Sequence, residues 1–475
     1  MGVLPVPHGQ QREVVYLREK GHCVVLGAAG SGKTVMAVHR ARHLAEAPGV
    51  GGPTLLVTFN QALVPYLRKL ADHPDVTVQT YHALARGYVS NRMKWREFVC
   101  GRQLKERLVA RALDDVRAAG GPVRSVLNRP VGFFLDELHW LAAHGISTPD
   151  SYTSGELRRI GRGTKLEAQD RAIAYRVYQR YVELREQANR RCDWDDLASI
   201  FLRLLQNDNN PRRYRHVVVD EGQDFTPEMI RSLAVAIPEE GSLTFFADYA
   251  QQLYGSRMSW RSLGLDVSRT VEFAQNYRNS LQVAHLARAI THLPHFRDEV
   301  ELVEPKDPKD DGLKPALVEA SSKDEQATLA VKYATNLSSD ERQDKDDHGQ
   351  VVILAPNETL TWRLQTELGE SRRTITRLDR NLDRWRTGRG IFYGTYRDAR
   401  GLEFDTVILP FCDADVLPSA EEVYAFGLDE AHARQARQLY VAVTRARKNL
   451  TLIYSGRMTE LLPSEASGLY ERLTP

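Results

Sequence analysis

Gly27-Ala-Ala-Gly-Ser-Gly-Lys33-Thr34 is the stretch that decides the fold, because it matches the pattern G-x-x-x-x-G-K-[ST] at every position. It follows the apolar run Cys23-Val-Val-Leu26 and opens a helical segment, which is the strand, loop and helix order of a phosphate-binding loop. The glycines allow backbone N–H groups to hold phosphate oxygens at a helix N-terminus. A glycine-rich turn that holds a lysine by chance is the alternative, and the flanking strand and helix argue against it. The predicted nucleotide contacts are Gly27, Gly30, Ser31, Gly32, Lys33 and Thr34.

A pair of acidic residues is expected beside this loop. The apolar run 216–219 ends in Asp220-Glu221, and the carboxyl ends of parallel strands meet at one edge of a sheet. In such a site Lys33 reaches the β- and γ-phosphates, while Thr34 and Asp220 hold Mg²⁺. Glu221 is the predicted general base that polarises the attacking water. Such a pair alone is often a helix N-cap, but together with the phosphate loop it predicts hydrolysis of a nucleoside triphosphate with Mg²⁺ as cofactor.

Short apolar runs alternate with helical stretches along the chain, which predicts an α/β fold with parallel sheets covered on both faces. The first sheet domain is expected at 1–88 and 215–269, and the second at 270–475. Between the halves of the first lies a mainly helical insertion at 89–214, with helices expected at 103–119 and 167–190. Charged stretches at 304–314 and 338–349 are expected to be exposed loops. The runs that predict strands are 22–26, 54–59, 77–81, 216–219, 243–247, 351–354, 391–395, 406–409 and 450–454.

The composition of the chain excludes some classes of protein but does not indicate a function. The 475 residues carry a formal net charge of only +2, and no apolar run approaches the roughly 18 residues of a membrane span. The four cysteines are scattered, so neither a disulfide framework nor a cysteine zinc site is expected, and the chain is predicted to be cytoplasmic with no membrane partner. Residues 89–213 hold 23 Lys and Arg against 16 Asp and Glu, an excess of 7 positive charges. This basic segment either follows a phosphate backbone or is a solvated helical surface.

The acidic pair belongs to a longer motif. Asp220-Glu-Gly-Gln-Asp224 resembles the DExQD box of the UvrD/Rep/PcrA helicases of superfamily 1A, and Asp193-Trp-Asp-Asp-Leu197 resembles their D-F-D-D-L element. Further segments that resemble family motifs follow in the family's order and cover nearly the whole chain. They are Gln11 ahead of the phosphate loop, Val57-Thr-Phe-Asn60, Gln79-Thr-Tyr-His82, Ala247-Asp-Tyr-Ala-Gln-Gln-Leu-Tyr254, Gln275-Asn-Tyr-Arg278, Thr395-Tyr-Arg-Asp-Ala-Arg-Gly-Leu-Glu-Phe404 and Tyr440-Val-Ala-Val-Thr-Arg445-Ala-Arg447.

The resemblance implies two RecA-like motor domains and a role for each matching position. Arg278 and Arg445 would reach the γ-phosphate from the second domain, and Gln251 would sense it and relay the signal toward DNA. A cation on the opposite lobe stabilises the charge of phosphoryl transfer and makes lobe closure depend on ATP. Gln11 would read adenine, Tyr277 would stack on it, and Glu403 would meet the ribose. The residues implied to contact single-stranded DNA are Phe59, Asn60, His82, Tyr254 and Arg397.

The chain also departs from the family pattern. Val35 stands where a basic residue is usual, and Ser256 replaces an aromatic residue for which Trp260 is a possible substitute. Arg397 and Arg400 replace a His and a Lys, which keeps positive charge with a different geometry. The large accessory domain of the family, called 2B, is reduced to about residues 369–390. Because the accessory domain is shortened, processive unwinding of duplex DNA is less expected of this chain than hydrolysis of ATP.

Two functions remain open at this point. The first is an ATP-dependent helicase or translocase that moves 3′-to-5′ on single-stranded DNA or a 3′-tailed duplex, in repair or replication restart. The second is a DNA-stimulated ATPase subunit or sensor that activates a partner nuclease in anti-phage defence, as the resemblance to the helicase-like component of Gabija systems suggests. A non-catalytic DNA-binding scaffold and an RNA substrate are weaker alternatives.

Overall fold

The structure is a computed structural model. It describes residues 4, 6–27, 31–120, 125–155, 157, 159, 164–210, 212–248, 260–273, 279–296, 311–339, 349–369, 375–378 and 390–474. Five of the predicted site residues therefore lie outside the described residues, as do most of the charged stretches expected to be loops. These five are Gly30, Gln251, Tyr254, Tyr277 and Arg278.

The phosphate-binding loop belongs to a six-stranded sheet in which every paired strand is parallel, in the order β3-β2-β6-β7-β1-β8. Alternate residues of β1 enter two different hydrophobic cores, Val25 on the side of α2 and Val24 on the side of α9 and α10. Both faces of the sheet are thus covered, which is why its strands are apolar throughout. The strands are β1 (Gly21–Gly27), β2 (Thr54–Thr58), β3 (Val76–Thr80), β6 (His216–Val219), β7 (Ser242–Ala247) and β8 (Val267–Phe273). The helices are α1 (Gln10–Val15), α2 (Lys33–Glu46), α3 (Val64–Ala71), α4 (Tyr81–Met93), α9 (Leu197–Gln206) and α10 (Pro227–Val235).

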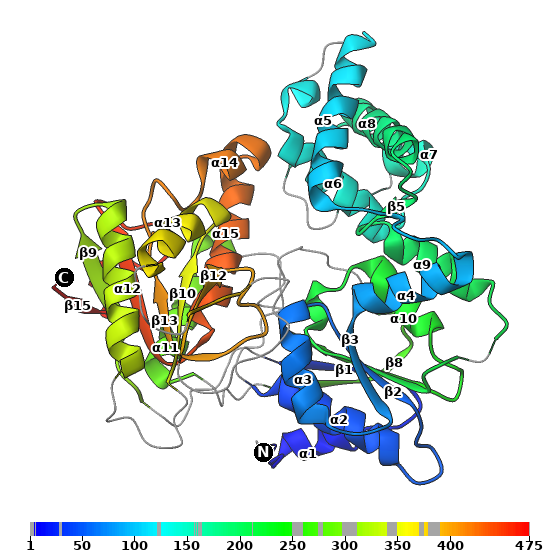
Figure 1. The fold of residues 1–475 in the computed structure, drawn as a ribbon, viewed down its shortest axis with the longest axis horizontal. Helices are drawn as coiled ribbons and strands as arrows, with labels where there is room; N and C mark the ends of the chain where they lie inside the picture. The colour runs from blue at the N-terminus through cyan, green and yellow to red at the C-terminus, as the bar shows by residue number, and fades with distance from the viewer. Residues whose placement is uncertain are drawn as a thin grey trace.

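A second parallel sheet of seven strands, β11-β12-β10-β13-β14-β9-β15, forms the other half of the molecule (Figure 1). The two parallel sheets with their helices confirm the predicted α/β class. The strands are β9 (Ala316–Ala320), β10 (Gln350–Ala355), β11 (Ile375–Arg377), β12 (Gly390–Thr395), β13 (Phe404–Leu409), β14 (Ala446–Ser455) and β15 (Glu471–Leu473). The helices are α11 (Leu281–Thr291), α12 (Lys323–Ser339), α13 (Glu358–Leu368), α14 (Ala420–Phe426) and α15 (Leu428–Val443).

Two details of the domain limits differ from expectation. β8 pairs with β1 through residues such as Thr270 and Phe273, so the first sheet continues past the boundary expected at residue 269. Within the segment 369–390, expected to replace the accessory domain, the part that the structure describes includes β11, which pairs with β12 at the edge of the second sheet. This segment therefore contributes a strand to the second sheet itself.

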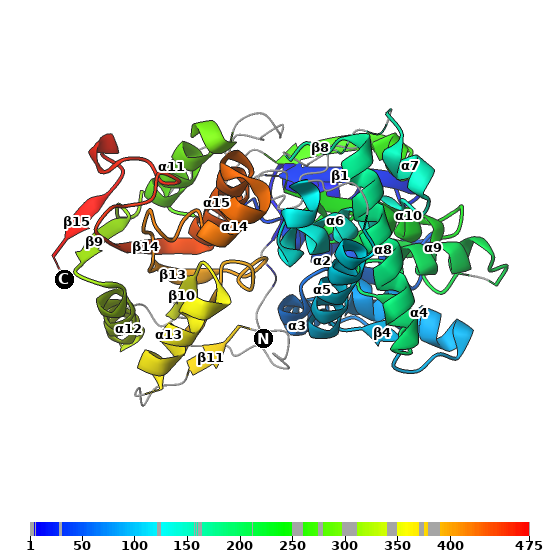
Figure 2. The same ribbon diagram turned by 90° about the horizontal axis from the view of Figure 1, so that it is seen from above.

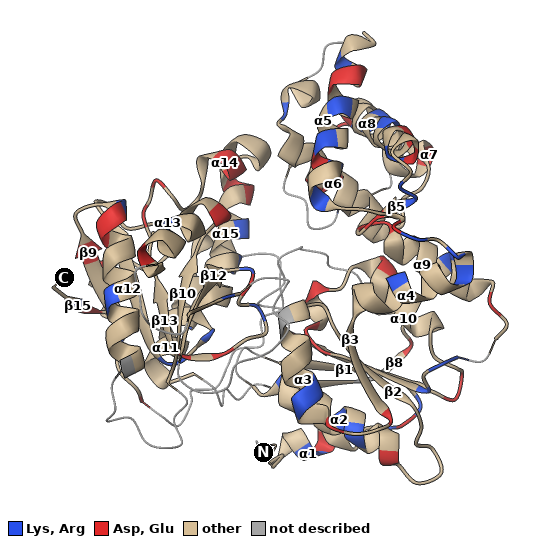
Figure 3. Cartoon of the chain, in the orientation of Figure 1, with Lys and Arg blue, Asp and Glu red and all other residues tan. Residues whose placement is uncertain are grey.

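The helical insertion stands apart from both sheets and has its own core (Figures 1 and 2). Its helices are α5 (Arg102–Ala118), α6 (Val131–His144), α7 (Pro149–Thr153) and α8 (Ala168–Gln187), and β4 (Val99–Cys100) pairs with β5 (Cys192–Asp193) at its base. Lys105 lies 2.7 Å from Asp193, and Arg185 lies 2.6 Å from Asp196. Figure 3 shows basic and acidic positions interspersed along the ribbons of these helices. Part of the basic excess is thus already paired within the insertion, which favours the structural interpretation of that charge.

The insertion contacts the second sheet domain through α15. Arg434 pairs with Asp136 of α6 at 2.6 Å, and its guanidinium lies 3.9 Å from the centre of the Phe426 ring. Glu430 accepts hydrogen bonds from the backbone N–H and the hydroxyl of Thr164 at 2.7 and 2.8 Å. These contacts connect the insertion to the second domain, and we call them the bridge.

No helix in the described parts of the chain is both long and apolar enough to cross a lipid bilayer.

Candidate active site

The two described ends of the phosphate-binding loop have the strand and the helix that the motif predicts. β1 ends at Gly27 and α2 begins at Lys33, after Gly32 in a left-handed conformation with φ 84°. A Cβ at position 27 would lie 2.5 Å from Ser31 Oγ, so a larger residue there would require the Ser31 side chain to move. Lys33 Nζ donates to the carbonyl of Gly27 at 2.8 Å and lies 3.5 Å from a carboxylate oxygen of Asp248. The lysine is therefore folded back over the loop, at the mouth where phosphates are expected.

Several polar atoms at this site fit Mg²⁺ and a nucleotide. Thr34 Oγ1 donates to Asp220 Oδ1 at 3.3 Å, which brings together the two side chains predicted to hold the metal ion. The hydroxyl of Ser31 and the second oxygen of Asp220 are buried and have no hydrogen-bond partner among the described residues. Burial, followed by the neighbouring Glu221, raises the pKa of Asp220 to about 7. A bound cation would restore the ionised carboxylate, so this site suits a divalent ion.

Glu221, the predicted base, is held in place by its own motif. Its backbone is left-handed with φ 54°, at the start of the short helix η3 (Gly222–Asp224). Gln223 donates from its amide nitrogen to Glu221, and its amide oxygen accepts from the backbone N–H of Asp248 at 2.8 Å. A Cβ at Gly222 would lie 2.4 Å from the Phe245 ring, which explains the glycine inside the motif. Gln223 was not predicted as a site residue, although its place between the two acids could have indicated it.

The second domain reaches this site through Arg400. Its guanidinium forms an ion pair with Asp224, and its backbone carbonyl accepts from the side-chain amide of Asn60. Gly401, with φ 75°, lies against Glu221, because a Cβ there would be 3.4 Å from the Glu221 carboxylate. Burial raises the pKa of Asp224 to about 6, although Arg400 opposes this shift. One loop of the second domain thus contacts the acidic motif and a predicted DNA-binding residue together.

Arg445 is fully buried at the end of α15. Its guanidinium donates to the carbonyls of Val441 at 2.9 Å and Leu402 at 3.3 Å, and to the hydroxyl of Thr444 at 3.1 Å. These bonds fasten α15 to the loop that carries Arg400. Glu403, the predicted ribose contact, is half-buried on the same loop.

Gln11, the predicted adenine contact, lies beside the phosphate-binding loop. Its amide nitrogen is 3.4 Å from the carbonyl of Ser31. Arg40, which was not predicted, is fully buried in α2 and donates to the carbonyls of Val15 at 2.9 Å and Leu17 at 2.6 Å. Burial lowers the pKa of Arg40 only to about 10, so it remains a cation. Arg40 therefore anchors the end of α1 and so positions Gln11.

Two of the predicted DNA contacts share an aromatic cluster. The ring centres of Phe59 and His82 are 5.2 Å apart, and those of His82 and Trp194 are 5.4 Å apart, both in edge-to-face arrangements. All three rings are half-buried, so each keeps some surface in contact with solvent. Trp194, in the Asp193-Trp-Asp-Asp-Leu197 element, was not predicted as a contact. Arg397 is exposed on the loop that precedes Arg400.

Comparisons with known proteins agree with this arrangement. A model of the UvrD/REP helicase N-terminal domain matches residues 8–271, and a model of the UvrD-like helicase C-terminal domain matches residues 384–457. The chain is 29% identical over 361 residues to the ATP-dependent DNA helicase UvrD2 of Mycobacterium tuberculosis, which covers 70% of this chain and 50% of UvrD2. It is 25% identical over 342 residues to the putative ATP-dependent DNA helicase YjcD of Bacillus subtilis, covering 66% and 41%. A probable DNA helicase of Mycoplasma pneumoniae is 24% identical over 471 residues, covering 94% and 82%. The chain thus spans about half the length of UvrD2, and less of YjcD.

Proposed function

The chain belongs to the UvrD/REP helicase family, and from this premise we propose that it hydrolyses ATP to move 3′-to-5′ along single-stranded DNA and to separate strands at a 3′-tailed duplex. The observation that carries the proposal is the double contact of Arg400, which pairs with Asp224 beside the predicted base and accepts a hydrogen bond from Asn60 on the DNA side. A motor needs such a link, because hydrolysis at one site must change contacts at the other.

The nucleotide site acts through groups already in position. Lys33 and the loop of Gly27, Ser31 and Gly32 hold the phosphates, and Gln11 contacts the base. Mg²⁺, held by Thr34 and Asp220, would neutralise charge on the phosphate oxygens. Glu221 accepts a proton from the attacking water, and Gln223 fixes the orientation of its carboxylate.

The second domain completes the site by closing on it. Arg445 is proposed to stabilise the charge on the transferred phosphoryl group, together with Arg278 and the sensor Gln251. Glu403 and Tyr277 are proposed to contact the ribose and the adenine. Because Arg445 donates to the carbonyl of Leu402 on the loop that carries Arg400, a shift of Arg445 at the phosphate would also move the contacts of Arg400 with Asp224 and Asn60.

The DNA site is proposed on the aromatic cluster and its neighbours. Phe59, His82 and Trp194 offer half-buried rings on which bases stack, and stacking holds single strands without regard to sequence. Asn60, Tyr254 and Arg397 are proposed to contact the strand beside these rings. The exposed guanidinium of Arg397 suits a phosphate of the backbone.

The test is the steady-state ATPase rate with and without single-stranded DNA, RNA and duplex, measured beside strand displacement on a 3′-tailed and a 5′-tailed substrate. The proposal expects strong stimulation by single-stranded DNA and displacement from the 3′ tail alone. A rate that no nucleic acid changes would overturn the DNA-coupled motor, and displacement from the 5′ tail would overturn the direction.

A second candidate is an ATPase sensor that activates a partner nuclease and unwinds little. The observation that favours it is β11, which places part of the shortened segment 369–390 in the motor sheet rather than in an accessory domain. DNA-stimulated ATPase without strand displacement, together with a stable complex with a co-expressed nuclease, is the result expected from this candidate. Robust displacement by the isolated chain would exclude it.

A further inference from the structure

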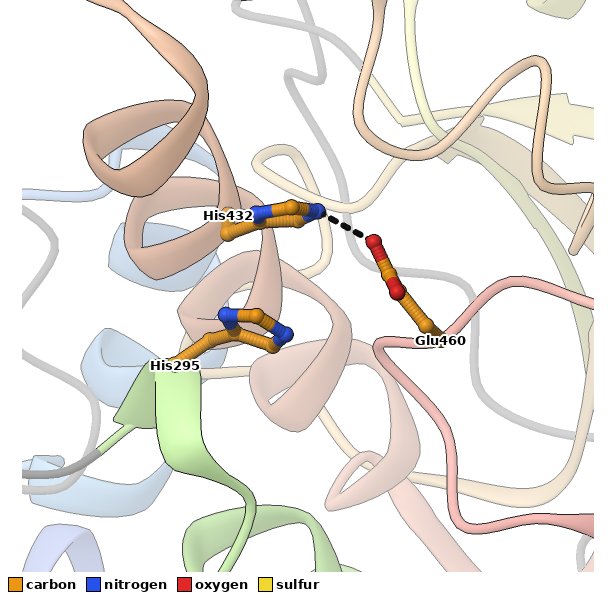
Figure 4. Close-up of side chains that lie close together, drawn as sticks. All are labelled: His295, His432 and Glu460. Carbon is orange, nitrogen blue, oxygen red and sulfur yellow. Dashed lines mark ion pairs between the residues drawn. The ribbon is translucent and has the colours of Figure 1, made fainter.

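A group of two histidines and a carboxylate lies in the second domain, outside the nucleotide site. His295 belongs to the short helix η6 (Pro294–Phe296), His432 to α15, and Glu460 to the segment after β14. The two imidazole rings are stacked, with centres 4.1 Å apart and planes inclined by 26°. A ring nitrogen of each histidine and a carboxylate oxygen of Glu460 all lie within 4.8 Å of one another. Figure 4 shows that the rings lie one above the other, with Glu460 beside them at their nitrogen-bearing edges.

Packing alone leaves His432 unexplained. Its ring is only 3% exposed, yet among the described residues neither ring nitrogen has a hydrogen-bond partner. Nε2 lies 2.7 Å from Glu460 Oε1, an ion pair when the imidazole is protonated, so its one contact is with another member of the group. Buried polar atoms in proteins are nearly always paired, so a buried ring whose Nδ1 has no partner among the described residues and whose Nε2 meets only Glu460 calls for a ligand.

We propose that His295, His432 and Glu460 form a site for a divalent transition-metal ion, zinc being the best fit. Two imidazole nitrogens and one carboxylate oxygen are a common three-ligand set for zinc, with a fourth position left for water. Bonds of about 2.0–2.2 Å to a tetrahedral ion place the ligand atoms about 3.4 Å apart. The observed separations, from 2.7 Å up to the 4.8 Å limit, bracket that value, so small side-chain rotations suffice.

The position of the site suggests what the metal would do. His432 lies on α15 between Glu430 and Arg434, which contact the insertion, and the same helix ends just before Arg445. A metal ion would tie α15 to η6 and to the segment of Glu460. It would therefore fix the helix that connects the insertion to the nucleotide-facing loop. This proposal does not depend on helicase activity.

The experiment is a cobalt titration of the full chain after removal of metals with a chelator. Co²⁺ in a tetrahedral nitrogen and oxygen site gives a visible absorption band, and we expect one equivalent of Co²⁺ to bind and zinc to displace it. Glu460→Gln and His295→Gln should weaken binding by more than about ten-fold. Glu460 is exposed and His295 half-buried, so both variants should keep the far-ultraviolet circular dichroism of the parent.

Two controls separate this site from others. His292→Gln removes an exposed histidine three positions from His295 and should leave the cobalt band unchanged. Asp220→Asn should also keep the band, because it alters only the predicted Mg²⁺ site. Zinc should raise the unfolding temperature of the parent and of His292→Gln but not of Glu460→Gln. Absence of a cobalt band in the parent, or equal binding by Glu460→Gln and His295→Gln, would overturn the proposal.

Discussion

Removal of the Arg400 guanidinium tests the link between the two motor domains. Asp224 is fully buried and forms an ion pair with Arg400, whose side chain is 7% exposed. In Arg400→Ala the carboxylate of Asp224 would remain buried without its cation. Leaving one partner of a buried ion pair alone costs about 3–5 kcal/mol. Asp224 can avoid part of this cost by taking up a proton, so the pH sets the size of the effect.

The pKa of Asp224 sets an upper limit on the free-energy cost of the Arg400→Ala substitution. It is already raised to about 6 with Arg400 present, and loss of the cation raises it further. Protonation at about pH 8 then costs at most about 2.7 kcal/mol, since each pH unit above the pKa costs about 1.4 kcal/mol. Protonation of Asp224 therefore costs less than burial of its unpaired carboxylate, so in the variant Asp224 takes up a proton. The penalty for domain closure is therefore up to about 100-fold near pH 8 and at most about 3-fold near pH 6.5.

The assay is kcat/KM for ATP at saturating single-stranded DNA, for parent and variant at both pH values. Arg457→Ala, which changes an exposed arginine of the same domain, serves as the control and should match the parent. Arg400→Ala combined with Asp224→Asn should recover most of the loss, because a neutral amide needs no counter-charge. A defect of the same size at both pH values, or no recovery in the double variant, would refute this account of the pair.

Four further outcomes are expected. Lys33→Ala should abolish ATP turnover while leaving the unfolding temperature near that of the parent, as a malachite-green phosphate assay and a thermal melt would show. Arg445→Ala should reduce hydrolysis much more than nucleotide affinity, and an equal loss of both in a fluorescent-nucleotide titration would contradict its proposed role at the transition state. Trp194→Ala should weaken single-stranded DNA binding by about 1–3 kcal/mol in fluorescence anisotropy, with the DNA-independent ATPase rate unchanged. Arg434→Ala breaks the contact with Asp136 and should raise amide hydrogen exchange in α6; unchanged exchange there would show that the bridge carries no stability.

The parts of the fold that were predicted from sequence are those fixed by local pattern. Each of the nine apolar runs became a strand, and the helices expected at 103–119 and 167–190 are α5 and α8. The phosphate-binding loop was equally visible, because its glycines and Lys33 stand at fixed spacings within one short stretch of sequence. The pairing of strands is not local, so the sequence could not show that β8 joins β1. Three-residue strands such as β11 are too short for a periodic signal.

The contacts that join distant segments could not be predicted. Arg400 and Asp224 are 176 positions apart, and the sequence indicated Arg400 only as a departure from the family pattern. Trp194 was visible inside a motif, but its neighbour His82 lies on α4, far from it in the sequence. His295, His432 and Glu460 come from three separate elements, and no spacing rule connects them. Each of these groups depends on how the chain packs, which a single sequence does not reveal.

The bridge to the insertion and the Arg400 link act on opposite ends of one structural element. α15 has 16 residues, and a helix of that length spans about 24 Å. Its first turns carry Glu430 and Arg434, which contact the insertion, and its last residue precedes the buried Thr444-Arg445 pair. A regular helix transmits displacement rather than absorbing it, because every backbone bond along it would have to change to let one end move alone. A displacement of the insertion would therefore be expected to shift Arg445, and with it the loop of Leu402 that carries Arg400. The described part of segment 369–390 adds a strand to the second sheet rather than forming an accessory domain. In this chain α15 is therefore the element that connects the insertion directly to the loop of Leu402 and Arg400.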